Sequence, residues 1–275
     1  MSVYPFEIRL GGFAITGYGI MMMVAFLMAG WAMQRELRRR RLDEDYAADI
    51  VVAAVVGGLL GAKLWYMALH GGPLLSRGGL VWYGGFLGGV VAVLLNGWRK
   101  RVPLFFTCEL CAPALALGYG LGRVGCFMVN DDYGVPSSLP WAMKFPRGLP
   151  PTTVADLGNS GVAFPPGTDP TQVVAVHPTQ LYETAVMLAV FAWLWHRRDH
   201  RHGTGWLFGG YLVCAGLERF LIEFIRVKDD RFLGGFSLAQ AVSVGLVLAG
   251  LHFLVRYRRA AAAPAEPAAL IPKTG

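Results

Sequence analysis

The chain has 275 residues, of which 55% are hydrophobic and 16% charged, and its mean hydropathy is +0.45. A typical soluble domain has about 45–50% apolar and about 25% charged residues. This composition excludes collagen, a coiled coil, a disordered chain and a small disulfide-stapled domain.

Seven apolar stretches follow one another and predict an all-α integral membrane protein. Stretches of about 18–25 apolar residues span a bilayer, although a buried soluble bundle is the alternative. We expect one polytopic membrane domain over 1–259, followed by a low-complexity, disordered cytoplasmic tail over 260–275. The predicted membrane-spanning helices cover 14–34, 46–69, 79–97, 104–122, 179–196, 205–225 and 236–255.

The basic residues orient these helices. The clusters RELRRRR, WRKR, HRRDHRH and RYRR follow the first, third, fifth and seventh stretches and hold more than half of the 25 Lys and Arg residues. Positive charge gathers on the cytoplasmic side of membrane proteins, so the N-terminus should be periplasmic and the C-terminus cytoplasmic. The net charge of +7 therefore reports orientation. Nucleic acid is not an expected partner, because no basic face is interleaved with aromatic residues.

A long segment rich in Pro, Gly and Thr, about 126–176, separates the fourth and fifth predicted helices on the periplasmic side. Loops longer than about 12–15 residues are uncommon unless they are functional, so we expect an arm or cap over a site. A disordered linker is the alternative. Trp141, Phe145 and Phe164 favour docking of this segment at the membrane interface.

Two short motifs resemble cofactor sites but lack the necessary context. Cys108-x-x-Cys111 is half of a metal or redox motif without a second pair, so buried free thiols are favoured and no metal is expected. Gly120-x-Gly122-x-x-Gly125 matches a dinucleotide fingerprint, but no strand precedes it. Its glycines instead suit the close approach of helices or of a lipid headgroup.

Ionisable residues inside membrane-spanning helices are costly and mark functional sites by default. Lys63 lies in the second predicted helix, where snorkelling to the interface is the alternative. Arg219, Glu223 and Arg226 share one helical face of the sixth. They form a structural ion-pair ladder, or else Arg226 offers its guanidinium fork to a phosphate.

The polar groups of several segments converge on the outer half of the membrane. His177 precedes Pro178 at a helix mouth, where it is either a general base or a cap. Two arginines with carboxylates and an imidazole describe a pocket for an anionic phospholipid headgroup, without specifying a reaction. The converging residues are Tyr18, Lys63, Tyr83, Arg123, Asp131, Asp132, His177 and Arg226.

At these residues the sequence resembles the bacterial prolipoprotein diacylglyceryl transferase family over nearly the whole chain. The motifs that carry the resemblance are YGI at Tyr18, LVWYGGFLGG at 80–89, GLGRVGCF leading to Gly134, HPTQLYE at 177–183 and EFIRVKD at 223–229. The resemblance implies a multi-pass enzyme of the bacterial inner membrane, with its active site in the periplasmic half.

The implied reaction transfers diacylglyceryl from phosphatidylglycerol to the lipobox cysteine in the signal peptide of an exported prolipoprotein. It forms a thioether and releases glycerol 1-phosphate without a metal or organic cofactor. Membrane lipids and prolipoprotein signal peptides are the implied partners. The resemblance implies catalytic roles for Arg226, His177, Tyr83 and Tyr18, and phosphatidylglycerol binding by Arg123, Gly125, Cys126, Asp131, Gly134 and Glu223.

The chain departs from the family pattern at three positions. Tyr83 stands where many members have a histidine, Cys126 where asparagine is usual, and Lys228 where proline is common. The first departure makes His177, or Tyr83 itself, the expected base for the thiol proton. The departures also keep open a non-catalytic or re-purposed paralogue that binds phospholipid. A transporter is disfavoured, because no internal repeat is evident.

Overall fold

The computed structural model describes residues 1–10, 13–71, 81–227, 231–233, 235–259 and 267–271. Seven long helices in these ranges lie at the seven predicted positions, and α1, α2, α4 and α8 are long and apolar enough to cross a membrane. The predictions for 72–80, for Lys228, and for 260–266 and 272–275 of the tail lie outside the described residues. The long helices are α1 (Gly17–Arg39), α2 (Asp45–His70), α3 (Trp82–Arg99), α4 (Leu104–Val129), α6 (Thr179–Arg197), α7 (Trp206–Ile222) and α8 (Leu238–Arg256).

The fold is helical, as predicted, and two small antiparallel hairpins accompany the helices. Strands β1 (Glu7–Leu10) and β2 (Phe13–Thr16) pair before α1, and β3 (Arg231–Leu233) pairs with β4 (Phe236–Ser237) before α8. Each following helix starts later than predicted because a side-chain cap defines its first turn. Thr16 Oγ1 accepts from the Gly19 amide, and Ser237 forms a reciprocal capping box with Gln240.

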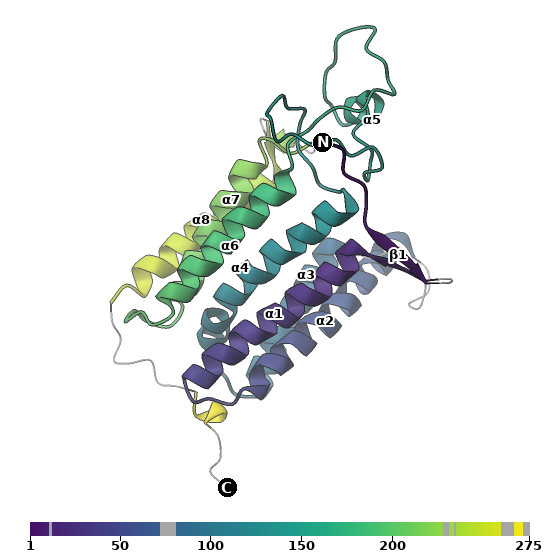
Figure 1. The fold of residues 1–275 in the computed structure, drawn as a ribbon. Helices are drawn as coiled ribbons and strands as arrows, with labels where there is room; N and C mark the ends of the chain where they lie inside the picture. Colours follow the sequence, from purple (N-terminus) through teal and green to yellow (C-terminus); the bar gives the residue numbers. More distant parts are fainter. Residues whose placement is uncertain (11–12, 72–80, 228–230, 234, 260–266, 272–275) are drawn as a thin grey trace.

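Helix α4 lies at the centre of the bundle (Figure 1), where it packs against α1, α6 and α7. It continues to Val129, so the predicted loop over 126–176 begins later than expected. The end of the helix is set by Asn130, which adopts the left-handed conformation with φ 59°. The arginine-glycine block therefore belongs to the last turns of a central helix.

Small residues let several helices approach closely. A Cβ on Gly57 would clash with Ala92 on the facing helix α3, and a Cβ on Gly88 would clash with Gly57. Helices α7 and α8 meet in the same way at Gly209 and Gly250. Small residues at such contacts are typical of helix packing in membranes.

The segment after Asn130 is a folded arm beyond one end of the helices, and it contains the short helix α5 (Val154–Asn159; Figure 1). Phe145 is fully buried and stacks on Tyr133, so the expected docking of Phe145 at the membrane interface is wrong. Tyr133 donates a hydrogen bond to the Pro150 carbonyl at 2.6 Å, and burial raises the pKa of this tyrosine. The arm has its own apolar core and is therefore not a disordered linker.

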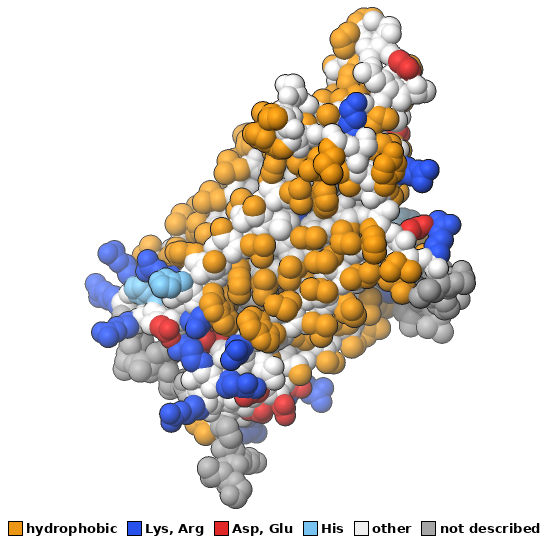
Figure 2. Space-filling view, in the orientation of Figure 1, with side chains coloured by type: hydrophobic (Ala, Val, Ile, Leu, Met, Phe, Trp, Pro, Cys, Tyr) orange, Lys and Arg blue, Asp and Glu red, His pale blue; other side chains and the backbone are white. Residues whose placement is uncertain are grey.

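The opposite end of the bundle carries most of the basic side chains visible in Figure 2, and hydrophobic side chains cover the middle of the same face. Of the predicted tail, residues 267–271 are described, and they include the 3-10 turn η1 (Ala268–Leu270). Leu270 is only 2% exposed, and its carbonyl accepts a hydrogen bond from the Asp43 amide. This part of the tail is docked against the helices.

Candidate active site

Arg123 and Arg226 meet at one carboxylate, that of Asp132. Arg123 Nη1 lies 2.8 Å from Asp132 Oδ2, and Arg226 Nη2 binds Oδ1. Asp132 has φ 61°, in the left-handed region that aspartate tolerates better than most residues. The structure thus brings together the two arginines singled out in the sequence, around a position that holds one anionic group.

Arg123 forms an ion pair with Glu183 on α6, a residue that was not among the predicted site residues. Its Nε lies 2.6 Å from Oε2 of Glu183, which also accepts a hydrogen bond from the Tyr119 hydroxyl at 2.6 Å. The Tyr119 ring centroid lies 5.2 Å from the guanidinium. Glu183 is 0% exposed and sits inside a predicted membrane-spanning helix. Its position is the signal that could have identified it, since intramembrane carboxylates are functional by default.

Arg226 lies four residues beyond the end of α7, whereas the prediction extended that helix to 225. The ion-pair ladder is confirmed, with Arg219 Nη2 2.5 Å from Glu223 and Arg226 Nη1 3.6 Å from the same carboxylate oxygen. The Arg226 side chain is only 4% exposed. A structural ladder and a phosphate site are therefore compatible, because one set of ion pairs presents Arg226 to Asp132.

Gly134 joins the turn after α4 to the segment after α7. It forms an isolated antiparallel bridge with Arg226, and its amide donates to the His177 carbonyl at 2.9 Å. A Cβ at this position would lie 2.5 Å from the Ile225 carbonyl oxygen and 2.7 Å from a methyl carbon of Thr179. Only glycine fits this junction without displacing backbone.

The HPTQLYE segment positions Asp132 through its backbone. Thr179 Oγ1 donates to the Asp132 carbonyl at 2.7 Å, and Gln180 Nε2 donates to the Asp131 carbonyl. Pro178 is the N-cap of α6, which begins at Thr179 as predicted. The motif therefore stabilises the turn that contains Asp132, and its last residue, Glu183, pairs with Arg123.

His177 is half-buried at the mouth of α6. Its Nδ1 lies 3.3 Å from the Tyr182 hydroxyl, which accepts a hydrogen bond from Trp141 Nε1 at 2.8 Å. Tyr182 thus connects the imidazole to the arm. His177 is therefore more than a helix cap, because its backbone and its ring both take part in the junction.

Four further predicted residues, Cys126, Gly125, Tyr18 and Asp131, lie near Arg123. Cys126 Sγ is 3.8 Å from Arg123 Nη1, and a Cβ on Gly125 would lie 3.3 Å from the Cα of Tyr18. Tyr18, in the first turn of α1, is 43% exposed. Asp131 Oδ1 accepts the Asp132 amide at 2.7 Å. The close contact at Gly125 agrees with the predicted role of these glycines.

Tyr83 and Lys63 belong to a different part of the bundle. Tyr83 is 54% exposed near the start of α3, which packs mainly on α2. Lys63, on α2, is buried with its ammonium 5.6 Å from the Tyr66 ring centroid, so it does not snorkel to an exposed position. These two residues lie on the α2–α3 pair, whereas Arg123, Glu183 and Arg226 come from α4, α6 and the segment after α7.

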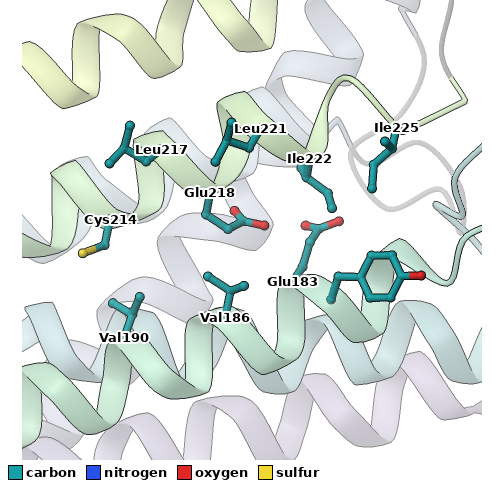
Figure 3. Close-up of a pocket in the computed structure, with 10 residues that line it drawn as sticks. Glu183, Val186, Val190, Cys214, Leu217, Glu218, Leu221, Ile222 and Ile225 are labelled. Carbon is teal, nitrogen blue, oxygen red and sulfur yellow. The ribbon is translucent and has the colours of Figure 1, made fainter.

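An apolar groove of about 400 Å³ runs between α6 and α7 (Figure 3). The carboxylates of Glu183 and Glu218 point into the space between the two helices. The groove lining includes Ile225, which precedes Arg226 in the chain, and Glu183, the ion-pair partner of Arg123. Within the described residues, no group of three or more His, Cys, Asp or Glu side chains is placed to hold a metal ion. The remaining lining is mostly apolar: Tyr182, Val186, Val190, Cys214, Leu217, Leu221 and Ile222.

Comparison with known proteins identifies the family of the chain. A family model described as prolipoprotein diacylglyceryl transferase matches residues 5–256. The chain is 32% identical over 272 residues to the phosphatidylglycerol–prolipoprotein diacylglyceryl transferase of Bordetella bronchiseptica, covering 90% of this chain and 93% of that protein. The enzyme of the same name from Pseudomonas paraeruginosa is 30% identical over 285 residues, covering 96% and 97%. The resemblance seen in the motifs is confirmed, and the chain belongs to the prolipoprotein diacylglyceryl transferase family.

Proposed function

We propose that this chain transfers the diacylglyceryl group of phosphatidylglycerol to the lipobox cysteine of exported prolipoproteins. One observation carries the proposal: Arg123 and Arg226 converge on a single anion position, and Glu183, which pairs with Arg123, lines an apolar groove. Phosphatidylglycerol combines the same two features, a phosphodiester and long acyl chains. The names of the relatives supply the acceptor, a prolipoprotein.

The reaction is a displacement at the glycerol carbon that bears the phosphoester. A base takes the proton of the cysteine thiol, and the thiolate attacks that carbon. The C–S bond forms as the C–O bond breaks, and the electron pair leaves with the phosphate of glycerol 1-phosphate. Arg123 and Arg226 stabilise the charge that develops on this leaving group. The step needs no oxidant, metal or organic cofactor.

Asp132 occupies the anion position before the substrate arrives. Its carboxylate keeps the two guanidinium groups at the separation that bridges one anion, and the lipid phosphate then shares or takes over these contacts. Glu223 and Gly134 hold Arg226 and its backbone in place. Asp131, Gly125 and Cys126 shape the wall next to Arg123.

His177 is our proposed base, because an imidazole can act as a general base and this ring contacts the Tyr182 hydroxyl. Tyr18 faces the lipid beside Gly125, where it can bind the headgroup. Tyr83, on α3, is proposed to act on the side from which the signal peptide approaches. The groove between α6 and α7 receives an acyl chain, since its lining is mostly apolar and includes Ile225, the residue before Arg226.

Seven membrane-spanning helices with a periplasmic N-terminus and a cytoplasmic C-terminus complete the proposal. The support is the hydrophobic surface over the middle of the face shown in Figure 2 and the concentration of Lys and Arg at the end of that face away from the arm. The arm and the arginine pair then lie at the periplasmic face of the bacterial inner membrane. The polytopic domain extends over 1–259.

Reconstitution tests the proposal directly. The full chain is placed in vesicles that contain phosphatidylglycerol, or phosphatidylethanolamine alone, and is given a peptide with a lipobox cysteine. We expect a diacylglyceryl mass gain on the cysteine only with phosphatidylglycerol, together with rescue of cells depleted of their own transferase. Binding of phosphatidylglycerol without transfer or rescue would instead identify the chain as a phospholipid-binding paralogue.

A further inference from the structure

The end of the bundle away from the arm contains a second cavity, of about 360 Å³, between the last turns of α1 and α6. Its arginines belong to the basic clusters RELRRRR and HRRDHRH, which the sequence uses to set orientation. These clusters are far apart in the chain, and only the packing of the helices brings them to one place. The cavity is lined by Trp31, Arg35, Arg39, Trp195 and Arg198.

Two tryptophans form one wall of this cavity and orient its cations. Trp31 and Trp195 stack with their ring centroids 6.2 Å apart. The guanidinium of Arg198 lies 4.2 Å from the Trp195 centroid, and that of Arg35 lies 5.8 Å from the Trp31 centroid. A guanidinium held over a ring keeps its N–H edges available for another partner.

A buried carboxylate behind the cavity anchors two of its arginines. Arg39 Nη2 lies 2.6 Å from Glu36 Oε1, and Arg198 Nε lies 3.6 Å from Glu36 Oε2. Arg39 also pairs with Asp199. Of the five residues that line the cavity, three are arginines and none is acidic. The cavity is therefore arranged to bind an anion. Glu36 and Asp199, the acidic partners of its arginines, are not part of its lining.

We propose that this cavity binds the phosphodiester headgroup of an anionic phospholipid from the membrane leaflet at that end of the bundle. A lipid is favoured over a free anion because the aromatic wall continues along the helices towards the middle of the membrane. Leu27, one turn before Trp31, is 64% exposed, and the Phe191 ring centroid lies 5.6 Å from that of Trp195. Basic pockets between membrane helices bind lipid headgroups in this manner.

The site is distinct from the Arg123–Arg226 pair, which lies at the arm end, and the proposal does not depend on the transferase activity. Its test uses the delipidated full chain in neutral detergent, titrated with phosphatidylserine or phosphatidylcholine and followed by native mass spectrometry. Phosphatidylserine is anionic but is not the diacylglyceryl donor. We expect wild type to bind phosphatidylserine and not phosphatidylcholine.

Arg35→Gln should weaken phosphatidylserine binding about five-fold, and Arg35→Gln combined with Arg198→Gln at least about ten-fold. Arg197→Gln, an exposed neighbour outside the cavity lining, is the matched control and should bind as wild type. If the double variant unfolds, Arg35→Gln alone decides, because Arg35 is not among the arginines paired with Glu36. Unchanged affinity in a folded Arg35→Gln protein, or full displacement by millimolar inorganic phosphate, would overturn the lipid proposal.

Discussion

Arg123 and Arg226 bind opposite oxygens of the same carboxylate, although one lies on α4 and the other follows α7. Asp132, which supplies that carboxylate, is itself held by the first turn of α6 through the Thr179 hydroxyl. Three separate segments therefore define one anion position. If the lipid phosphate binds at this position, changes to its contacts should alter anion binding or transfer.

Asp132→Asn should destabilise the protein and make it responsive to anions. Removing one partner of a buried ion pair costs about 3–5 kcal/mol, because the remaining charge is left uncompensated. Added inorganic phosphate should restore part of the lost thermal stability by occupying the same position. Thermal unfolding in detergent measures both effects. Asp131→Asn is the matched control, and an equal response to phosphate in wild type and Asp132→Asn would contradict the assignment.

Arg123→Lys and Arg226→Lys should each lower transfer by about a hundred-fold or more, because loss of a preorganised charge-stabilising donor has this effect. Lysine keeps the charge but cannot provide the planar fork that reaches Asp132 and a second carboxylate together. A gel-shift assay with a lipobox substrate measures the loss. Arg197→Gln, at the exposed end of α6, should retain wild-type activity. Near-normal transfer by either lysine variant would remove its arginine from the mechanism.

Glu183→Gln should reduce transfer about ten- to hundred-fold by loosening Arg123. A hydrogen bond to a charged group contributes about 1.5–3 kcal/mol, and Glu183 supports both Arg123 and Tyr119. Initial rates at varied phosphatidylglycerol concentration separate a binding defect from a catalytic one. Glu218 lines the same groove from α7, and Glu218→Gln should reduce transfer less. Equal losses in the two variants would show that the effect comes from the groove and not from Arg123.

Gly134→Ala should destabilise the junction between the α4 turn and Arg226. The added Cβ would collide with the Ile225 carbonyl oxygen and with Thr179, and overpacking of this kind costs about 1–3 kcal/mol. Gly158→Ala in the arm is the control, since a Cβ there would meet nothing within 4 Å. Unfolding midpoints should fall only for Gly134→Ala, with transfer lost in parallel. A normal midpoint for Gly134→Ala would mean that the junction adjusts.

Cys126→Ser should keep most of the transfer activity. The thiol makes a weak 3.8 Å contact with Arg123, and a hydroxyl can replace that contact. Cys214→Ser, whose thiol lines the groove, serves as the comparison. Mass spectrometry of the lipobox peptide measures transfer by both variants. Complete inactivity of a folded Cys126→Ser protein would instead identify Cys126 as a covalent participant.

The sequence by itself determined the approximate positions of the seven long helices and singled out the two arginines that meet at Asp132. Bilayer thickness imposes a run of apolar residues that can be counted without a structure. The cost of burying charge identified Arg123 and Arg226 for a similar reason, since such residues are retained only with a purpose. The starts of α1 and α8 were harder to predict from the sequence, because they depend on the local caps at Thr16 and Ser237.

Only the tertiary structure decided which charges meet. Nothing in sequence spacing places Glu183 on Arg123, assigns Asp132 to both arginines, or locates Tyr83 on a separate helix pair. The same holds for Arg35 and Arg198, whose clusters share a cavity only because α1 and α6 end side by side. Hydrophobicity selects the helices along the chain, whereas electrostatic pairing across the bundle depends on which helical faces pack together.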